Sequence, residues 1–236
     1  MQINISSLIG YHLEATDGEM GKVTAFYFDD VTWTIRYLVV ETGNWLSGRK
    51  VLISPDAILK ESGKTGSFTV NLTKSQVSNS PAIDTEKPVS QQQEAELFNH
   101  YPWPNYWEGG FSSSGVWGIL APTSSTNIIH ETDTDHPLLS ADSNTHLHST
   151  KVVAGYNIHA TDGDIGHVKD FIIEDHTWKV IFFVVDTHNF FPGKKVLLPV
   201  SNIQEVQWND SKVKINITQE EVKNCRLFDI AEFTQW

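Results

Sequence analysis

The sequence predicts a mainly β protein made of two small antiparallel β-barrels in tandem. The first reason is an internal repeat, because residues 10–58 align without a gap with residues 155–203, at one constant offset of 145. The second is that each copy consists of short apolar segments separated by glycine-containing turns, which is typical of a small barrel. The third is a threonine-led helix start after each copy. We therefore expect each barrel to be followed by a short helix, and a partly helical linker to join the two.

Each copy opens with a predicted β-hairpin. Apolar and polar residues alternate before the turn, which is the period of a half-buried strand. The turns themselves are Asp17-Gly18 and Asp162-Gly163, dipeptides that accept the positive φ angles of a tight hairpin. We interpret these four residues as structural turns, and Gly21 as the site of a β-bulge or of a sharp coil at a barrel corner.

A tryptophan-bearing strand follows the hairpin in both copies. Residues 32–40, which include Trp33, are rich in β-branched and aromatic side chains and nearly continuous in apolar character. This is the pattern of a strand that is buried on both faces. Trp178 holds the matching place in the second copy. We expect both tryptophans in the core, each with a partner for its indole N–H.

The end of each copy predicts a short helix. Thr73 and Gln76 have the spacing of a capping box, in which the two side chains satisfy the first free amides of a helix. Thr218 and Glu221 repeat this spacing in the second copy.

The repeat also predicts how the chain divides. In the segment between the two copies, a second helix is expected from Ser90 to Tyr101, because the proline at position 102 cannot continue it. Residues 111–141 are rich in serine and threonine, lack periodicity and predict a polar loop. The predicted units are a first barrel at 1–86, a linker at 87–145 and a second barrel at 146–236.

Charge argues against nucleic acid as a partner. The formal net charge of −12 repels phosphate backbones, so binding of nucleic acid is not expected. Two basic pairs, Arg49-Lys50 and Lys194-Lys195, recur at matching places in the copies. We favour a charged strand entrance over a phosphate site for both pairs.

Cysteine usage and hydropathy favour a protein of the cytoplasm. Cys225 is the only cysteine, so no intrachain disulfide forms and a reducing compartment is the natural interpretation. The first residues lack the pattern of a signal peptide, and no apolar run approaches the roughly 20 residues of a membrane span.

Histidine and aspartate gather in and after the polar loop. They suggest a metal site, but their spacing matches no zinc pattern. The sequence therefore predicts neither a metal nor another cofactor. The residues are His130, Asp133, Asp135, His136, His146 and His148.

The repeat also suggests a two-sided active site. Bilobal aspartic proteases bring one aspartate from each half to a shared axis, within an Asp-Thr/Ser-Gly motif. Asp17 and Asp162 are followed directly by glycine, so the hydroxyl residue of that motif is missing. Cys225 lies near the end of the predicted last helix and aligns with Ser80, which favours a structural thiol over a nucleophile. We predict no catalytic residue and no enzymatic activity.

Five aromatic residues form the candidate interaction surface. Two of them lie in matching loops before a glycine, where surface contact is plausible. Three lie in the linker, where they are too large and apolar for a simple tether and are expected to pack across a barrel or between the two barrels. The five are Trp45, Phe190, Trp103, Tyr106 and Trp107.

These motifs resemble the PRC-barrel family. The resemblance rests on the Asp-Gly hairpin followed by glycine, the Trp-bearing strand ending in Val-Val-(Asp/Glu)-Thr, and Gly-(Arg/Lys)-Lys-Val-Leu, all present twice. The family takes its name from the barrel of the photosynthetic reaction centre H subunit, and a related barrel occurs in a ribosome maturation factor. The resemblance implies a small antiparallel barrel and an adaptor-like role without a shared active site.

The expected function is therefore a non-enzymatic interaction module with an unidentified protein partner. The duplication predicts that the barrels pair about a pseudo-twofold axis, as single-barrel homodimers do, and leaves homo-oligomers open. Three alternatives also stay open: an RNA- or ribosome-associated assembly factor, a small-molecule or metal-responsive binding protein, and a hydrolase.

Overall fold

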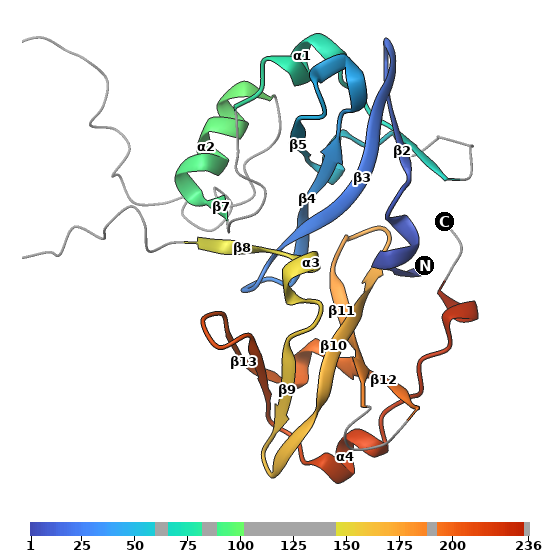
Figure 1. Ribbon diagram of the computed structural model, residues 1–236, viewed down its shortest axis with the longest axis vertical. Coiled ribbons are helices and arrows are strands. Elements are labelled where there is room, and N and C mark those ends of the chain that lie inside the picture. Colours follow the sequence, from blue (N-terminus) through green and yellow to red (C-terminus); the bar gives the residue numbers. More distant parts are fainter. Residues whose placement is uncertain (60–65, 82–88, 102–144, 188–192, 234–236) are drawn as a thin grey trace, which may run out of the picture.

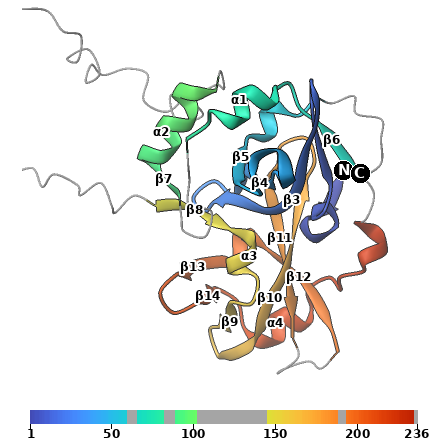
Figure 2. The ribbon, with the colours of Figure 1, turned by 45° about the horizontal axis from the view of Figure 1, so that its top comes forward.

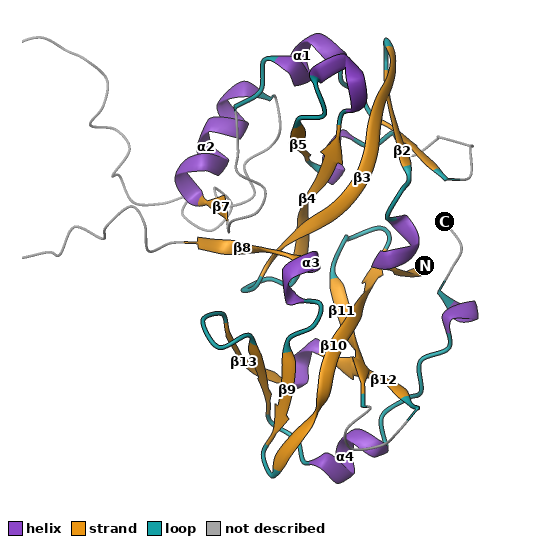
Figure 3. Ribbon diagram, in the orientation of Figure 1, coloured by secondary structure: helices purple, strands orange, loops and turns teal. Residues whose placement is uncertain are grey.

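Two seven-stranded sheets, one for each copy of the repeat, make up the fold. The computed structural model describes residues 1–59, 66–81, 89–101, 145–187 and 193–233. The sheets follow one another along the long axis of the molecule (Figure 1), and strands dominate both of them (Figure 3). The mainly β character expected from the sequence is therefore confirmed.

The first sheet has the order β5-β4-β3-β2-β6. Strands β2 and β3 form the predicted hairpin, and β4 and β5 extend the sheet in antiparallel fashion, whereas β6 runs parallel to β2. The strands are β2 (His12–Ala15), β3 (Gly18–Asp29), β4 (Thr34–Glu41), β5 (Lys50–Ile53) and β6 (Ser67–Thr69). The 3-10 turns are η1 (Ile5–Leu8), η2 (Gly43–Leu46) and η3 (Pro55–Ala57).

The second sheet has the order β12-β11-β10-β9-β14-β13, and here β14 runs parallel to β9. The strands are β9 (Asn157–Ala160), β10 (Gly163–Glu174), β11 (Val180–Asp186), β12 (Lys195–Pro199), β13 (Ile203–Gln207) and β14 (Lys212–Ile215). The shorter elements are α3 (Thr150–Val153), η6 (Val200–Asn202) and η7 (Ile230–Glu232).

The expectation of closed, wholly antiparallel barrels needs correction. Within the described residues, no ladder joins β5 to β6 or β12 to β13, so each sheet is open. One pair in each sheet is parallel, because β6 and β14 return to the hairpin by a crossover connection and enter in the direction of its first strand.

Short helices follow each sheet. In α1 (Lys74–Ser78), the Thr73 hydroxyl accepts from the Gln76 amide at 3.2 Å, while the Gln76 side chain accepts from the Thr73 amide at 2.9 Å. Helix α4 (Gln219–Lys223) carries the same capping box. In the linker, β7 (Val89–Ser90) precedes α2 (Gln91–His100), which lies beside the first sheet (Figure 2).

The two copies exchange their leading strands. Strand β1 (Gln2–Asn4) pairs with β10 of the second copy, and β8 (Thr145–Ser149) pairs with β3 of the first. The registers are equivalent under the repeat offset: Ile3 faces Ile173, as His148 faces Phe28. Each sheet is therefore completed by a strand that precedes the other copy in the chain, and the two sheets form one symmetric unit.

The paired tryptophans lie where the copies meet. Trp33 and Trp178 occupy the turns before β4 and β11 with φ of 56° and 55°, so they are turn residues and not strand residues as expected. The Trp178 carbonyl accepts from the Ile35 amide at 2.8 Å, and the Trp33 carbonyl accepts from the Val180 amide at 2.7 Å. Both side chains are half-buried and pack against the core, not inside it.

Aromatic contacts cross from one copy to the other at the same place. The Trp33 ring meets Phe183 of the second copy edge-on, with ring centroids 5.5 Å apart. The Trp178 ring lies 6.2 Å from Phe68 of the first copy. Each tryptophan therefore packs against the core of the opposite copy, which explains why the sequence places one at this position twice.

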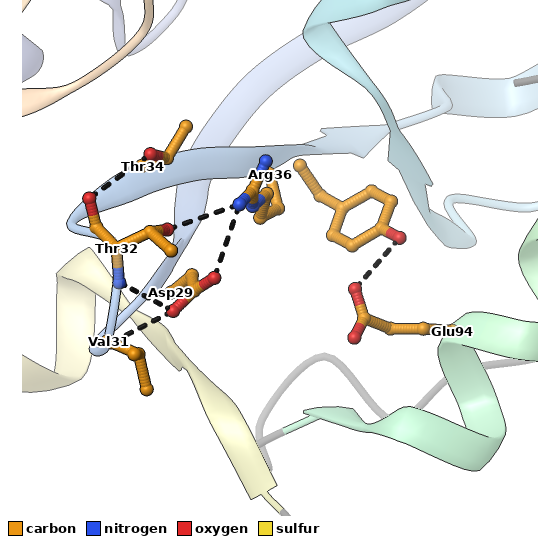
Figure 4. A network of polar contacts seen from close by, with 7 residues as sticks. Asp29, Val31, Thr32, Thr34, Arg36 and Glu94 are labelled. Carbon is orange, nitrogen blue, oxygen red and sulfur yellow. Dashed lines mark hydrogen bonds and ion pairs between the residues drawn. The ribbon is translucent and has the colours of Figure 1, made fainter. Parts of the chain in front are cut away.

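A buried carboxylate shapes the turn that carries Trp33 (Figure 4). Asp29, which is 3% exposed, accepts from the amides of Val31 and Thr32 at 2.8 and 3.0 Å and from Arg36 at 3.3 Å. Burial alone would raise the pKa of this carboxyl, but the bonds to Thr32 and Val31 and the Arg36 charge hold that pKa below its usual value.

Candidate functional site

Trp45 lies in a groove at one end of the first sheet. The side chain belongs to η2, in the connection from β4 to β5, and is half-buried. Its indole N–H donates to the Met20 carbonyl of β3, which fixes the ring orientation. The Lys74 ammonium lies 5.6 Å from the ring centroid, within the range of a cation–π contact.

The predicted turn residue Asp17 determines where Lys74 lies. Its carboxylate accepts from the Lys74 amide at 2.9 and 3.2 Å, so the tip of the β2–β3 hairpin is tied to the first residue of α1. Asp17 is thus a turn residue and also an acceptor for a free helix amide. Asp162 does the same for the Gln219 amide at 2.8 Å.

A glycine allows close approach of the strands beneath the groove. The β2–β3 register shifts between the Leu13–Gly21 and Glu14–Glu19 pairs, so the chain forms a β-bulge at Met20, directly before Gly21. A Cβ atom at Gly21 would lie 2.0 Å from the Glu41 carbonyl oxygen, and at Gly166 it would lie 1.9 Å from that of Asp186. Both copies therefore need glycine at this point to bring β4 or β11 against the bulge.

The groove has a volume of about 440 Å³. It combines an aromatic face, two lysines and two glutamates, so it offers apolar contact and charges of both signs. Residues 42–45 of the β4–β5 connection contribute to its lining. The side chains that line it include Glu19, Lys22, Glu41, Asn44, Trp45 and Lys74.

The second copy differs at the corresponding position. Gln219 replaces Lys74, and its side-chain amide donates to the Asp164 carbonyl at 2.9 Å. A neutral side chain that is bonded to the hairpin thus stands where the first copy has an ammonium group. Phe190, the counterpart of Trp45 in the interaction surface expected from the sequence, lies outside the described residues.

The other residues singled out in the sequence either make structural contacts or lie outside the residues that the structure describes. The Arg49 guanidinium donates to the carbonyls of Ser78, Ser80 and Pro81 at 3.2, 2.7 and 2.8 Å, so it holds the end of α1. Trp103, Tyr106 and Trp107 lie outside the described residues, as do His130, Asp133, Asp135 and His136.

The hairpins that carry Asp17 and Asp162 lie at opposite ends of the molecule (Figure 1). The two carboxylates are therefore not brought together as the two-sided active site would require. Burial, and then the Glu221 charge, raise the pKa of the Cys225 thiol, which disfavours the nucleophilic thiolate.

Where the structure describes histidines, several lie beside a single carboxylate and not within a larger group of ligands. His148 is buried, stacks on Trp208 with ring centroids 3.2 Å apart, and lies 3.2 Å from an Asp30 oxygen. Among the described residues, no group of three or more histidine, cysteine, aspartate or glutamate side chains is placed to hold a metal ion.

Lys74 is one of the site residues that sequence reasoning missed. The capping box depends on Thr73 and Gln76, and that pattern assigns no role to Lys74 between them. The sequence could have indicated Lys74 through its difference from Gln219, the residue at the equivalent position of the second copy. Two copies of one domain that differ in charge at an exposed position can differ in what they bind there.

Comparison with known proteins agrees with this architecture. The family model described as PRC-barrel domain matches residues 1–77 and 155–222. The chain belongs to the PRC-barrel domain family and carries the domain twice. A search of curated proteins finds no match. Within the described residues, no helix has the length and apolar character needed to cross a membrane.

Proposed function

We propose that the protein is a non-enzymatic interaction module that binds an extended segment of a partner protein in the Trp45 groove. The observation that carries this proposal is the aromatic ring of Trp45 facing a groove of about 440 Å³ with Lys74 at its side. Aromatic side chains with a fixed orientation are the usual anchors of protein interfaces, because they bury large area at little entropic cost.

The partner segment is expected to be amphipathic. Lys22 and Lys74 attract acidic side chains, Glu19 and Glu41 attract basic ones, and the Trp45 ring accepts an apolar or aromatic residue between them. The interface would be of the small, transient kind, because the groove has a volume of only about 440 Å³. A reducing compartment suits this role, since Cys225 is the sole cysteine.

The test is site-specific photo-crosslinking in the native cell. A benzophenone amino acid at Asn44, which is exposed at the groove, is expected to capture a defined partner; the same group at Val31, which is exposed on the turn between β3 and β4, serves as the matched control. Binding of that partner to the Trp45→Ala variant should weaken by about 2 kcal/mol, the scale of an interface anchor. Equal capture from both positions, or unchanged binding by Trp45→Ala, would remove the proposal.

A further inference from the structure

A second hollow lies on the first copy, and Glu41 lines both this hollow and the Trp45 groove. Its volume is about 390 Å³, and we call it the Ala25 pocket. It is formed by β3, β4 and β5 together with the exchanged segment that begins the second copy. The residues that line it include Thr24, Ala25, Glu41, Lys50, Ser149 and Lys151.

The repeat provides an internal comparison for this pocket. In the second copy Asp170 stands where the first copy has Ala25, while Asn4 and Ser6 stand where it has Ser149 and Lys151. The Asp170 carboxylate accepts from the Asn4 side-chain amide and, at 3.2 Å, from the Ser6 backbone amide. Asp170 is 8% exposed and Asn4 1%. A buried carboxylate is thus built into the second copy at the place that is hollow in the first.

The backbone around this position is equivalent in both copies. A register shift interrupts the ladder just before Ala25 and Asp170 alike. The amide that follows the bulge is satisfied differently: Asp170 accepts from the Phe171 amide at 2.8 Å, whereas the Thr150 hydroxyl accepts from the Phe26 amide at 3.2 Å. The first copy therefore folds without the carboxylate and leaves its volume unfilled.

The pocket has the chemistry to replace that carboxylate with a bound one. The buried Ser149 lines the pocket, and its hydroxyl makes no capping hydrogen bond to the α3 helix that follows it. Lys50 lies directly opposite Glu41 in the β4–β5 ladder, a cross-strand position at which opposite charges attract. Lys151 makes no ion pair with any residue that the structure describes, and it supplies the charge that an anion requires.

We propose that the Ala25 pocket binds a small organic acid with one carboxylate and a short aliphatic chain. The carboxylate takes the position that the Asp170 carboxylate holds in the second copy, with Ser149 and Lys151 as donors. The aliphatic chain lies against Val39 and Val152, the apolar residues of the lining. This site is separate from the Trp45 groove and does not depend on the proposed interaction with a protein.

Butyrate is the probe, and its neutral isostere butyramide is the control. Titration of the full-length protein at constant ionic strength, followed by amide NMR, should give saturable shifts at Phe26, Lys151 and Val152. The dissociation constant is expected on the order of 1 mM for so small a ligand. Butyramide should give no saturable shift, because the charge-assisted contact is lost.

Two variants locate the site. Ala25→Asp places in the first copy the carboxylate that the second copy already holds, and it should abolish butyrate binding. Lys151→Gln, an exposed substitution that leaves the core intact, should weaken binding about fivefold, the effect of losing one partly exposed ion pair. Butyrate shifts that do not saturate, that butyramide reproduces, or that persist unchanged in both variants would overturn the proposal.

Discussion

At the scale of single residues, the two turn tryptophans combine an unfavourable backbone with a favourable side-chain position. A left-handed conformation costs a residue with a Cβ atom about 1 kcal/mol relative to glycine. Trp33 and Trp178 adopt it in both copies, and each ring packs against aromatic residues of the opposite copy. The contact between the copies therefore outweighs the local strain at each turn.

At most positions an alanine variant is more stable than a glycine variant, but at Trp33 we expect the glycine variant to be the more stable of the two. Both variants lose the ring and should be destabilised by about 3 kcal/mol, the lower end for buried aromatics. Trp33→Gly should nevertheless be the more stable by about 1 kcal/mol, because glycine accepts the positive φ. Urea denaturation measures both, with Ile35 in β4 as the control, where alanine should be the better residue. If the alanine variant were more stable than the glycine variant at Trp33 as well as at Ile35, the positive φ of Trp33 would be contradicted.

The Asp29 carboxylate predicts a specific dependence of stability on pH. Its pKa is lower in the folded protein than in the unfolded chain, so its contribution is complete above the unfolded value and is lost as pH falls through the folded value. Asp29→Asn should lower the free energy of unfolding by about 2 kcal/mol at neutral pH. The difference from wild type should shrink in acid.

Denaturation curves at neutral and acidic pH test this prediction. Asp210→Asn, at an exposed position, is the control and should leave the free energy of unfolding unchanged at both. A constant difference between Asp29→Asn and wild type across the acidic range would show that the charge of Asp29 does not contribute.

Residue patterns could be predicted where their physics is local. The Asp17-Gly18 turn, the bulge at Gly21 and the Thr73–Gln76 spacing each depend on neighbours a few positions away, and the structure has a turn, a bulge and a cap there. The left-handed Trp33 could not be predicted, because positive φ is rare for bulky residues and its compensation comes from the other copy.

At the scale of elements, the exchanged strands β1 and β8 bind the copies together. Each is only a few residues long and lies far along the chain from the strand it pairs with. The strand propensity of a short segment does not show which distant strand it pairs with, because the pairing register depends on residues far away in the sequence. For the same reason the open sheets and the parallel β2–β6 pair were not anticipated from the sequence.

Substitution in an exchanged strand should destabilise the opposite copy. Ile3 is fully buried against β10, so Ile3→Ala should speed hydrogen exchange in the end of β10 at residues 171–174 and not in β3. Leu147 is the reciprocal control, because it pairs with β3 and Leu147→Ala should expose residues 27–29. If each variant instead raised the hydrogen-exchange rate in the copy that follows the substituted strand in the chain, the two copies would not exchange their leading strands.

At the scale of the whole molecule, a symmetric frame carries two different surfaces. The turns, glycines and helix caps are the same in both copies and give them the same backbone. The surfaces differ because equivalent positions carry different residues: Lys74 in the first copy corresponds to Gln219 in the second, and Ala25 corresponds to Asp170. The sequence predicts the frame well because repetition marks it. It points to Trp45 but does not reveal the two hollows, since each is formed by residues from several segments and, in the Ala25 pocket, from both copies.

The exchange of strands makes the two copies one folding unit, and cutting the connection between them tests that claim most directly. A protease site placed between Ser124 and Ser125 of the full-length protein allows cleavage after folding. We predict that the two fragments still elute together in size-exclusion chromatography and separate only in denaturant, because β1–β10 and β3–β8 pairing hold them. Elution of two separate folded fragments in native buffer would contradict the account.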